Sequence, residues 1–151
     1  MDYTELDLLV VAKNTLSNIH IDFQSVEYEN IIFDINCAIH RKCEHNIIND
    51  TIDINVEKTQ NIYYCDKCYI TFTTSFIKDY LLKYLDQNKR DQWKIITNEG
   101  IFDLLDIYCQ NNMLCFQIWS FGWANSSNIL KFSLKNILNC NVDSSIVYVN
   151  N

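Results

Sequence analysis

Cysteine and histidine residues gather in two short segments, and they carry the clearest chemical signal in the sequence. The segments are "CAIHRKCEH", residues 37–45, and "CDKC", residues 65–68. Cys-x-x-Cys spacing is typical of zinc sites and of redox-active dithiols, and a structural zinc site takes four thiolate or imidazole ligands. One interpretation is therefore a zinc site with the ligands Cys37, Cys43, Cys65 and Cys68, with His40 or His45 as substitutes.

The residue pattern favours a second interpretation, in which these cysteines are buried strand residues and the protein has no metal or other cofactor. Residues 62–72 alternate as in a β-strand. Cys65 and Cys68 are an odd number of positions apart, so an unbroken strand would place them on opposite faces. No Gly or Pro follows the pair to shape a knuckle, although Asp66 and Lys67 could form a turn. Cys37 lies in an alternating apolar run and is expected in the core.

Other catalytic chemistry finds little support in the residues. A redox dithiol belongs at a helix N-terminus, and here the next predicted helix begins several residues later. A Cys–His hydrolase needs one activated thiol beside one base, and any pair from the seven Cys and three His could be proposed. The presence of these residues is therefore not specific evidence for such an enzyme. Asp103 and Asp106 would diverge on a strand, and two Gly residues cannot build a Gly-rich phosphate loop. We expect a protein that is not an enzyme.

The elements that would position these residues read as an α+β fold built on an antiparallel β-meander. Alternating apolar residues predict strands in residues 19–23, 29–39, 51–57 and 61–72. Apolar residues at helical spacing predict an amphipathic helix over about 74–87, and residues 4–13 are either a short helix capped by Thr4 or a buried strand. Further strands are expected at 92–97, 101–108 (helix being the alternative), 113–121, 129–134 and 145–149, with turns at Gly100 and Asn111-Asn112.

Length and charge limit the classes of function. The 151 residues predict a single globular domain over 1–151. The net charge of −7 argues against nucleic acid and anionic membranes as partners. The start "MDYTELDLL" lacks a basic n-region and no apolar run approaches about 20 residues, so we expect a cytoplasmic protein with free thiols.

Two surfaces are candidates for binding a partner. If the early strands form one sheet, acidic and amide side chains share its outer face, and polar side chains on a half-buried sheet are also expected without any binding role. A second candidate is "IWSFGWANSS", where aromatic residues alternate, although such residues are more often core. The candidate partner-binding residues are Asp22, Asp34, Asp53, Glu57, Trp119 and Trp123.

The profile resembles the small immunity proteins of bacterial polymorphic-toxin and contact-dependent inhibition systems. The resemblance covers the order of elements, with an early meander, then "TTSFIKDYLLKYL" as a helix, then "WKIITNEGIFDLLDIYCQNNMLCFQI" as hairpins, together with size and acidity. It implies a protein that binds and neutralises a cognate toxin domain, often a nuclease with a basic cleft. Charge complementarity would speed such an encounter. The cysteine-rich segments are not explained by the resemblance.

Two alternatives stay open. One is a viral host-interaction protein of similar build. The other is a small zinc-stabilised adaptor that uses Cys37, Cys43, Cys65 and Cys68.

Overall fold

The computed structural model describes residues 4–119 and 127–150. The chain divides into two compact units, residues 1–71 and 72–151. Both helices and strands occur in each unit, so the predicted α+β class is confirmed. The prediction of one domain over the whole chain stays a prediction.

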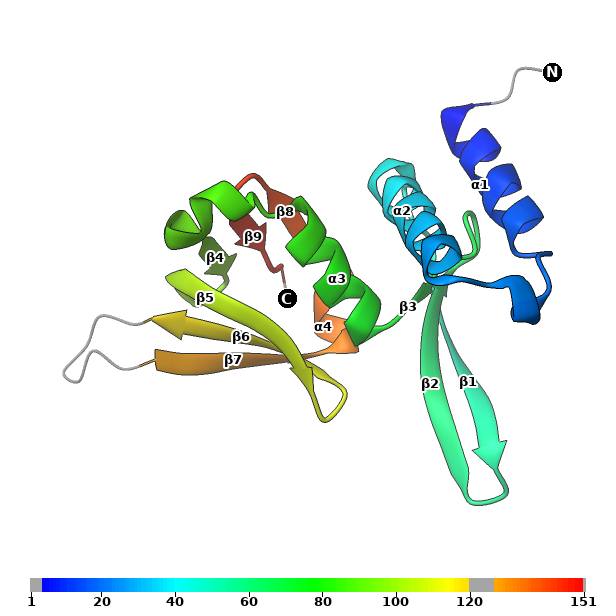
Figure 1. The fold of residues 1–151 in the computed structure, drawn as a ribbon. Coiled ribbons are helices and arrows are strands. Elements are labelled where there is room, and N and C mark those ends of the chain that lie inside the picture. The colour runs from blue at the N-terminus through cyan, green and yellow to red at the C-terminus, as the bar shows by residue number, and fades with distance from the viewer. Residues whose placement is uncertain (1–3, 120–126, 151) are drawn as a thin grey trace. The chain divides into compact units, whose positions relative to one another are not determined.

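The N-terminal unit consists of two helices followed by a long β-hairpin (Figure 1). Its elements are α1 (Glu5–Leu16), the 3-10 turn η1 (Ile21–Phe23), α2 (Val26–Lys42), β1 (Ile47–Asn55), β2 (Lys58–Cys65) and the start of β3 (Thr71–Phe72). The strands form an antiparallel sheet in the order β1-β2-β3.

Helix α1 confirms the helical alternative for residues 4–13. Thr4 is its N-cap: the Thr4 hydroxyl accepts from the Asp7 backbone N–H at 3.2 Å, and the Asp7 carboxylate accepts from the Thr4 N–H at 3.0 Å. This reciprocal capping box satisfies two backbone donors that a helix N-terminus leaves without partners. The helix packs on α2, where Glu5 and Lys42 form an ion pair at 2.9 Å.

Helix α2 replaces the strand predicted for residues 29–39, and that prediction is wrong. Apolar residues in and next to this segment also recur at helical spacing, as Tyr28, Ile32, Ile35 and Ile39 show. The Ser25 hydroxyl caps the helix by accepting from the Tyr28 N–H at 3.2 Å. As a result Ile39 is fully buried while Ile31, which the strand pattern placed in the core, is 49% exposed. Residues 19–23 likewise form η1 and not a strand.

The β1–β2 hairpin is a ribbon whose far half is exposed on both faces. Ile47 pairs with Cys65 at its open end, and Asn55 pairs with Lys58 next to the turn. All side chains from Asn49 to Asn61 are exposed. The turn is stabilised by the Asn55 side chain, which accepts from the Glu57 N–H at 2.8 Å.

The C-terminal unit is a six-stranded mixed sheet with a helix packed on it (Figure 1). Its elements are α3 (Thr74–Tyr84), the 3-10 segment η2 (Gln87–Gln92), β4 (Lys94–Thr97), β5 (Gly100–Gln110), β6 (Met113–Trp119), β7 (Ser127–Ser133), α4 (Leu134–Ile137), β8 (Asn141–Asp143) and β9 (Ile146–Tyr148). The strand order is β7-β6-β5-β4-β9-β8, and β4 and β9 run parallel. The sheet is therefore larger and more mixed than the predicted meander.

Most predictions for this unit are confirmed. The helix predicted over 74–87 is α3, which ends at Tyr84 and is capped by the Thr73 hydroxyl. Residues 101–108 lie in β5 and are strand. Asn111 and Asn112 make the β5–β6 turn with φ of 53° and 59°, and Gly100 has φ of 144°. Asn and Gly are the residues that adopt positive φ most easily.

Candidate metal centre

Four side chains of the N-terminal unit bring their ligand atoms together. The thiols of Cys43, Cys65 and Cys68 and a ring nitrogen of His45 all lie within 4.8 Å of one another. Cys43 is the C-cap of α2, His45 precedes β1, and the two remaining cysteines flank the end of β2. The three cysteines are buried and His45 is half-buried.

Two of the donor–donor distances match those of a tetrahedral zinc ion. In a tetrahedron with Zn–S bonds near 2.3 Å and Zn–N bonds near 2.0 Å, neighbouring sulfurs lie about 3.8 Å apart and sulfur and nitrogen about 3.5 Å apart. The Cys43 and Cys65 sulfurs are 3.8 Å apart, and the Cys68 sulfur is 3.5 Å from Nδ1 of His45. A disulfide would need about 2.05 Å. The donor set of three thiolates and one imidazole is one that structural zinc sites use.

A tight turn places Cys65 and Cys68 on the same side of the chain. Strand β2 ends at Cys65, where the Tyr69 N–H donates to the Cys65 carbonyl at 2.9 Å and the Cys65 N–H donates to the Ile70 carbonyl at 3.0 Å. Tyr69 takes the left-handed conformation, with φ of 62°. The prediction of an unbroken strand through residues 61–72 is therefore wrong, and so is the argument that it kept the two thiols apart.

The electrostatics of the cluster favour one thiolate before any metal binds. Burial raises the pKa of Cys43 to about 12, and hydrogen bonds to Cys68 and Cys65 add to the effect. Burial also acts to raise the pKa of Cys65. Hydrogen bonds from the Cys68 backbone, the His45 side chain and the Lys67 and Asn46 backbones outweigh it and lower this pKa to about 6. The Lys67 N–H lies 3.4 Å from the Cys65 sulfur, and such donors stabilise a thiolate ligand.

Lys13 of α1 places positive charge beside the cluster. Burial lowers the pKa of Lys13, and its electrostatic interaction with Cys68 opposes this change. A divalent ion held by three thiolates and a neutral imidazole carries one net negative charge. Lys13 is therefore suited to balance that charge.

The cluster also supplies half of the small core of the N-terminal unit. In residues 4–71, the buried apolar side chains are Cys37, Ile39, Cys43, Cys65, Cys68 and Ile70. Half of them are members of the cluster. By contrast, nineteen apolar side chains are buried in the described part of the C-terminal unit, including Phe72, Leu81, Trp93 and Phe116. Domains below about 70–80 residues rarely have a sufficient core without disulfides or a metal.

The remaining cysteines lie outside the cluster. Cys37, a ligand in the predicted set, is fully buried in α2, as its place in the apolar run predicted. His45, which the sequence offered only as a substitute, takes the fourth position. Cys109 is exposed, and Cys115 and Cys140 are buried in the C-terminal unit.

The predicted partner-binding residues do not share one sheet face. Asp22 lies in η1, Asp34 in α2, Asp53 in β1 and Glu57 in the hairpin turn, and all four are exposed. The idea of a common acidic sheet face fails because α2 is a helix. Trp119 is half-buried at the end of β6, and Trp123 lies outside the described residues.

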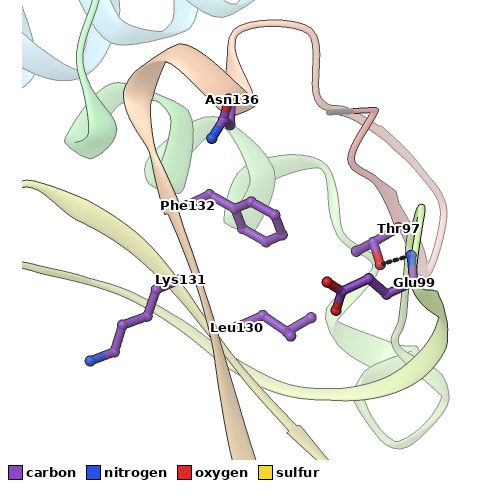
Figure 2. Close-up of a pocket in the computed structure, with 6 residues that line it drawn as sticks. All are labelled: Thr97, Glu99, Leu130, Lys131, Phe132 and Asn136. Carbon is purple, nitrogen blue, oxygen red and sulfur yellow. Dashed lines mark hydrogen bonds between the residues drawn. The ribbon is translucent and has the colours of Figure 1, made fainter.

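A small pocket lies in the described part of the C-terminal unit (Figure 2). Its volume is about 210 Å³, and it is lined by Thr97, Glu99, Leu130, Lys131, Phe132 and Asn136. The Thr97 hydroxyl accepts from the Glu99 backbone N–H at 3.1 Å. Ligand pockets usually measure about 300–1,000 Å³, so this pocket is small for an active site.

The fold and the cluster define a small α+β protein with a candidate Cys3His metal centre in its N-terminal unit. Comparisons with protein families, with curated proteins and with solved structures found no match to this chain. In the described part of the chain, no helix combines the length and apolar character that crossing a bilayer requires.

Proposed function

We propose that this protein is a non-catalytic binding protein whose N-terminal unit is held together by a structural zinc ion. The observation that carries the zinc proposal is that the ligand atoms of Cys43, His45, Cys65 and Cys68 lie within 4.8 Å of one another, with two donor–donor distances that match a zinc tetrahedron. Four protein ligands would fill the tetrahedron and leave no position for a water or a substrate. Catalytic zinc sites keep such a position open, whereas structural sites are closed.

Zinc at this place would anchor the β1–β2 hairpin. Cys43 and His45 lead into β1, and Cys65 ends β2 opposite Ile47, so the cluster lies at the open end of the hairpin. An isolated two-stranded hairpin is only marginally stable in water. A metal that ties both strand ends to α2 would hold the exposed ribbon in one conformation.

Metal analysis of the purified full-length chain tests the zinc proposal. We expect one equivalent of zinc per chain, and we expect Cys68→Ala to lose it. Cys37→Ala is the matched control, because Cys37 is equally buried in the same unit but is not in the cluster. A wild-type protein purified without zinc that also fails to bind added zinc would refute the proposal.

We further propose that the hairpin contacts a protein partner with a basic surface. Residues 49–61 carry three carboxylates (Asp50, Asp53 and Glu57) and one ammonium group (Lys58). Next to them Ile52, Ile54 and Val56 are 42%, 58% and 105% exposed. Exposed apolar side chains rimmed by charge are typical of interaction sites, and the toxin domains that immunity proteins neutralise are a partner class of this kind.

Charge-reversal variants test whether the carboxylates of the hairpin, and not acidic residues elsewhere, contribute to partner binding. If a toxin domain is encoded beside this gene, Asp53→Lys with Glu57→Lys should slow its association with the chain and reduce the salt dependence. Asp34→Lys, on helix α2, is the control for net charge. Equal effects of both changes, or none, would contradict a role of the hairpin in recognition.

A further inference from the structure

The imidazole of His45 is held at both of its nitrogens. Nδ1 lies 3.5 Å from the Cys68 sulfur, on the side of the metal cluster. Nε2, on the opposite side of the ring, lies 2.9 Å from Nδ1 of His40. The two rings are inclined by only 21°, with centroids 4.9 Å apart. One nitrogen therefore faces the donor set while the other faces a hydrogen-bond partner.

The positions of the protons follow from this arrangement. A ring nitrogen that binds a metal cannot carry a proton, so metal binding through Nδ1 leaves the proton of neutral His45 on Nε2. That N–H is 2.9 Å from Nδ1 of His40, which must then be the acceptor. An accepting Nδ1 places the proton of His40 on its own Nε2.

We propose that His40 is the positioning residue of the metal centre: it accepts a hydrogen bond from Nε2 of His45 and thereby presents Nδ1 of His45 to the metal. The inference rests on the zinc proposal and adds a fifth side chain to it. It also accounts for the segment "CAIHRKCEH", in which one histidine binds the metal and the other orients it. Outer partners of this kind fix the tautomer and the orientation of metal-binding imidazoles.

The end of α2 explains why His40 can take this role. His40 lies three residues before Cys43 in the last turn of α2, and residues three apart share one face of a helix. The same helical turn therefore fixes the Cys43 ligand and the acceptor for the His45 ligand. A rigid helix holds the acceptor in place better than a loop would.

Loss of the acceptor should weaken the metal site without removing any ligand. In His40→Phe the ring volume is kept, but the His45 N–H loses its partner and the imidazole can rotate away from the metal. We expect zinc affinity to fall about 10–100-fold, the range found when such partners are removed. His40→Gln offers a side-chain carbonyl as acceptor and should recover most of that loss.

The experiment combines affinity with the protonation of His45. Zinc affinity is measured on the full chain by competition with a chromophoric chelator for the wild type, His40→Phe and His40→Gln. His20→Phe is the control, because His20 is exposed beside η1 and outside the cluster. In the wild type, nitrogen NMR of the zinc-loaded protein reports which ring nitrogen of His45 holds the proton, and we expect Nε2.

Each outcome decides the inference. A His40→Phe protein that binds zinc as tightly as the wild type would overturn it, and so would NMR that places the His45 proton on Nδ1. If His40→Phe fails to fold, the wild-type NMR spectrum still decides, because a His40 that carries its proton on Nδ1 could not accept from His45. A wild type that takes up no zinc would overturn the zinc proposal as well, and that failure is recognised by metal content before any variant is compared.

Discussion

Removal of the metal should unfold the N-terminal unit and spare the C-terminal unit. Apart from the cluster, the largest buried side chains in residues 4–71 are Ile39 and Ile70. Complete burial of such a side chain contributes about 1.5–3 kcal/mol, so the pair contributes at most about 6 kcal/mol. Zinc in a structural site contributes an apparent ~10–16 kcal/mol near pH 7. The metal would therefore be the larger of the two terms.

Hydrogen exchange read by mass spectrometry on the full chain measures this effect. After complete chelation, peptides from α2 and the β1–β2 hairpin should lose their protection, because ordering the chain costs about 1–2 kcal/mol per residue and the remaining core is small. Peptides from α3, β5 and β6 should keep theirs, since Leu81, Leu104 and Phe116 are buried away from the cluster in sequence. Restored zinc should restore the protection. Unchanged exchange in residues 26–68 of a protein proven free of metal would refute the reasoning.

Three further changes give distinct signatures. Tyr69→Gly should stabilise the zinc-loaded protein by up to about 1–2 kcal/mol in chemical unfolding, because Tyr69 has φ of 62° and is 68% exposed; a loss of stability would count against backbone strain there. Hydrogen bonds from the Thr4 backbone and hydroxyl lower the pKa of Asp7. The Asp7 carboxylate therefore stabilises α1 fully above the ordinary carboxyl pKa of 3.8, and this stabilisation is lost as the pH falls through the lowered pKa of the folded protein. The protection of the α1 amides, relative to their intrinsic exchange rates, should fall over that acidic range, and Thr4→Ala should lower it already at neutral pH. Leu81→Ala should destabilise the C-terminal unit by about 2–5 kcal/mol and leave the zinc content at one equivalent; loss of zinc would contradict separate cores.

Much of the C-terminal unit could be predicted because its local signals agree with one another. The helical spacing of Ile77, Tyr80 and Leu81 predicts a helix, and all three side chains are buried in α3. Asn111-Asn112 and Gly100 mark turns by their tolerance of positive φ. The parallel pairing of β4 with β9 could not be foreseen, since it joins strands about 50 residues apart and no local pattern encodes it.

The sequence of helix α2 predicts a strand because its apolar residues recur both at the two-residue period of a strand and at the 3.6-residue period of a helix. Ile31, Phe33 and Ile35 alternate as in a strand, but the 17-residue length exceeds that of ordinary strands. Ser25 followed by Glu27 and Glu29 is an N-terminal helix signal. That signal, weighed against the alternation, would have identified the helix.

The same error displaced one ligand of the candidate metal centre. The sequence placed Cys43, Cys65 and Cys68 in the alternative zinc set but put Cys37 in the fourth position, where the structure has His45. Cys37 lies within α2, six residues before the C-cap Cys43. It is therefore more than one helical turn from the end of α2 where the cluster forms. Asp66 and Lys67 were the only local signal of the turn after Cys65, because a tyrosine rather than a glycine takes the left-handed position at residue 69.

The metal centre and the proposed binding surface lie at opposite ends of one hairpin, and this separates their roles. From Ile47 to Val56 the strand rises by about 3.3 Å per residue, so the turn is roughly 30 Å from the cluster. A partner at the turn would not touch the metal, and zinc would affect binding only by anchoring the ribbon. Chelation should therefore weaken partner binding while the remaining affinity keeps its salt dependence. Glu57→Lys should reduce the salt dependence while the protein keeps its zinc. If a chelated protein whose hairpin amides were still protected lost the salt dependence, the partner would be recognising the charge of the metal centre and not the carboxylates of the hairpin.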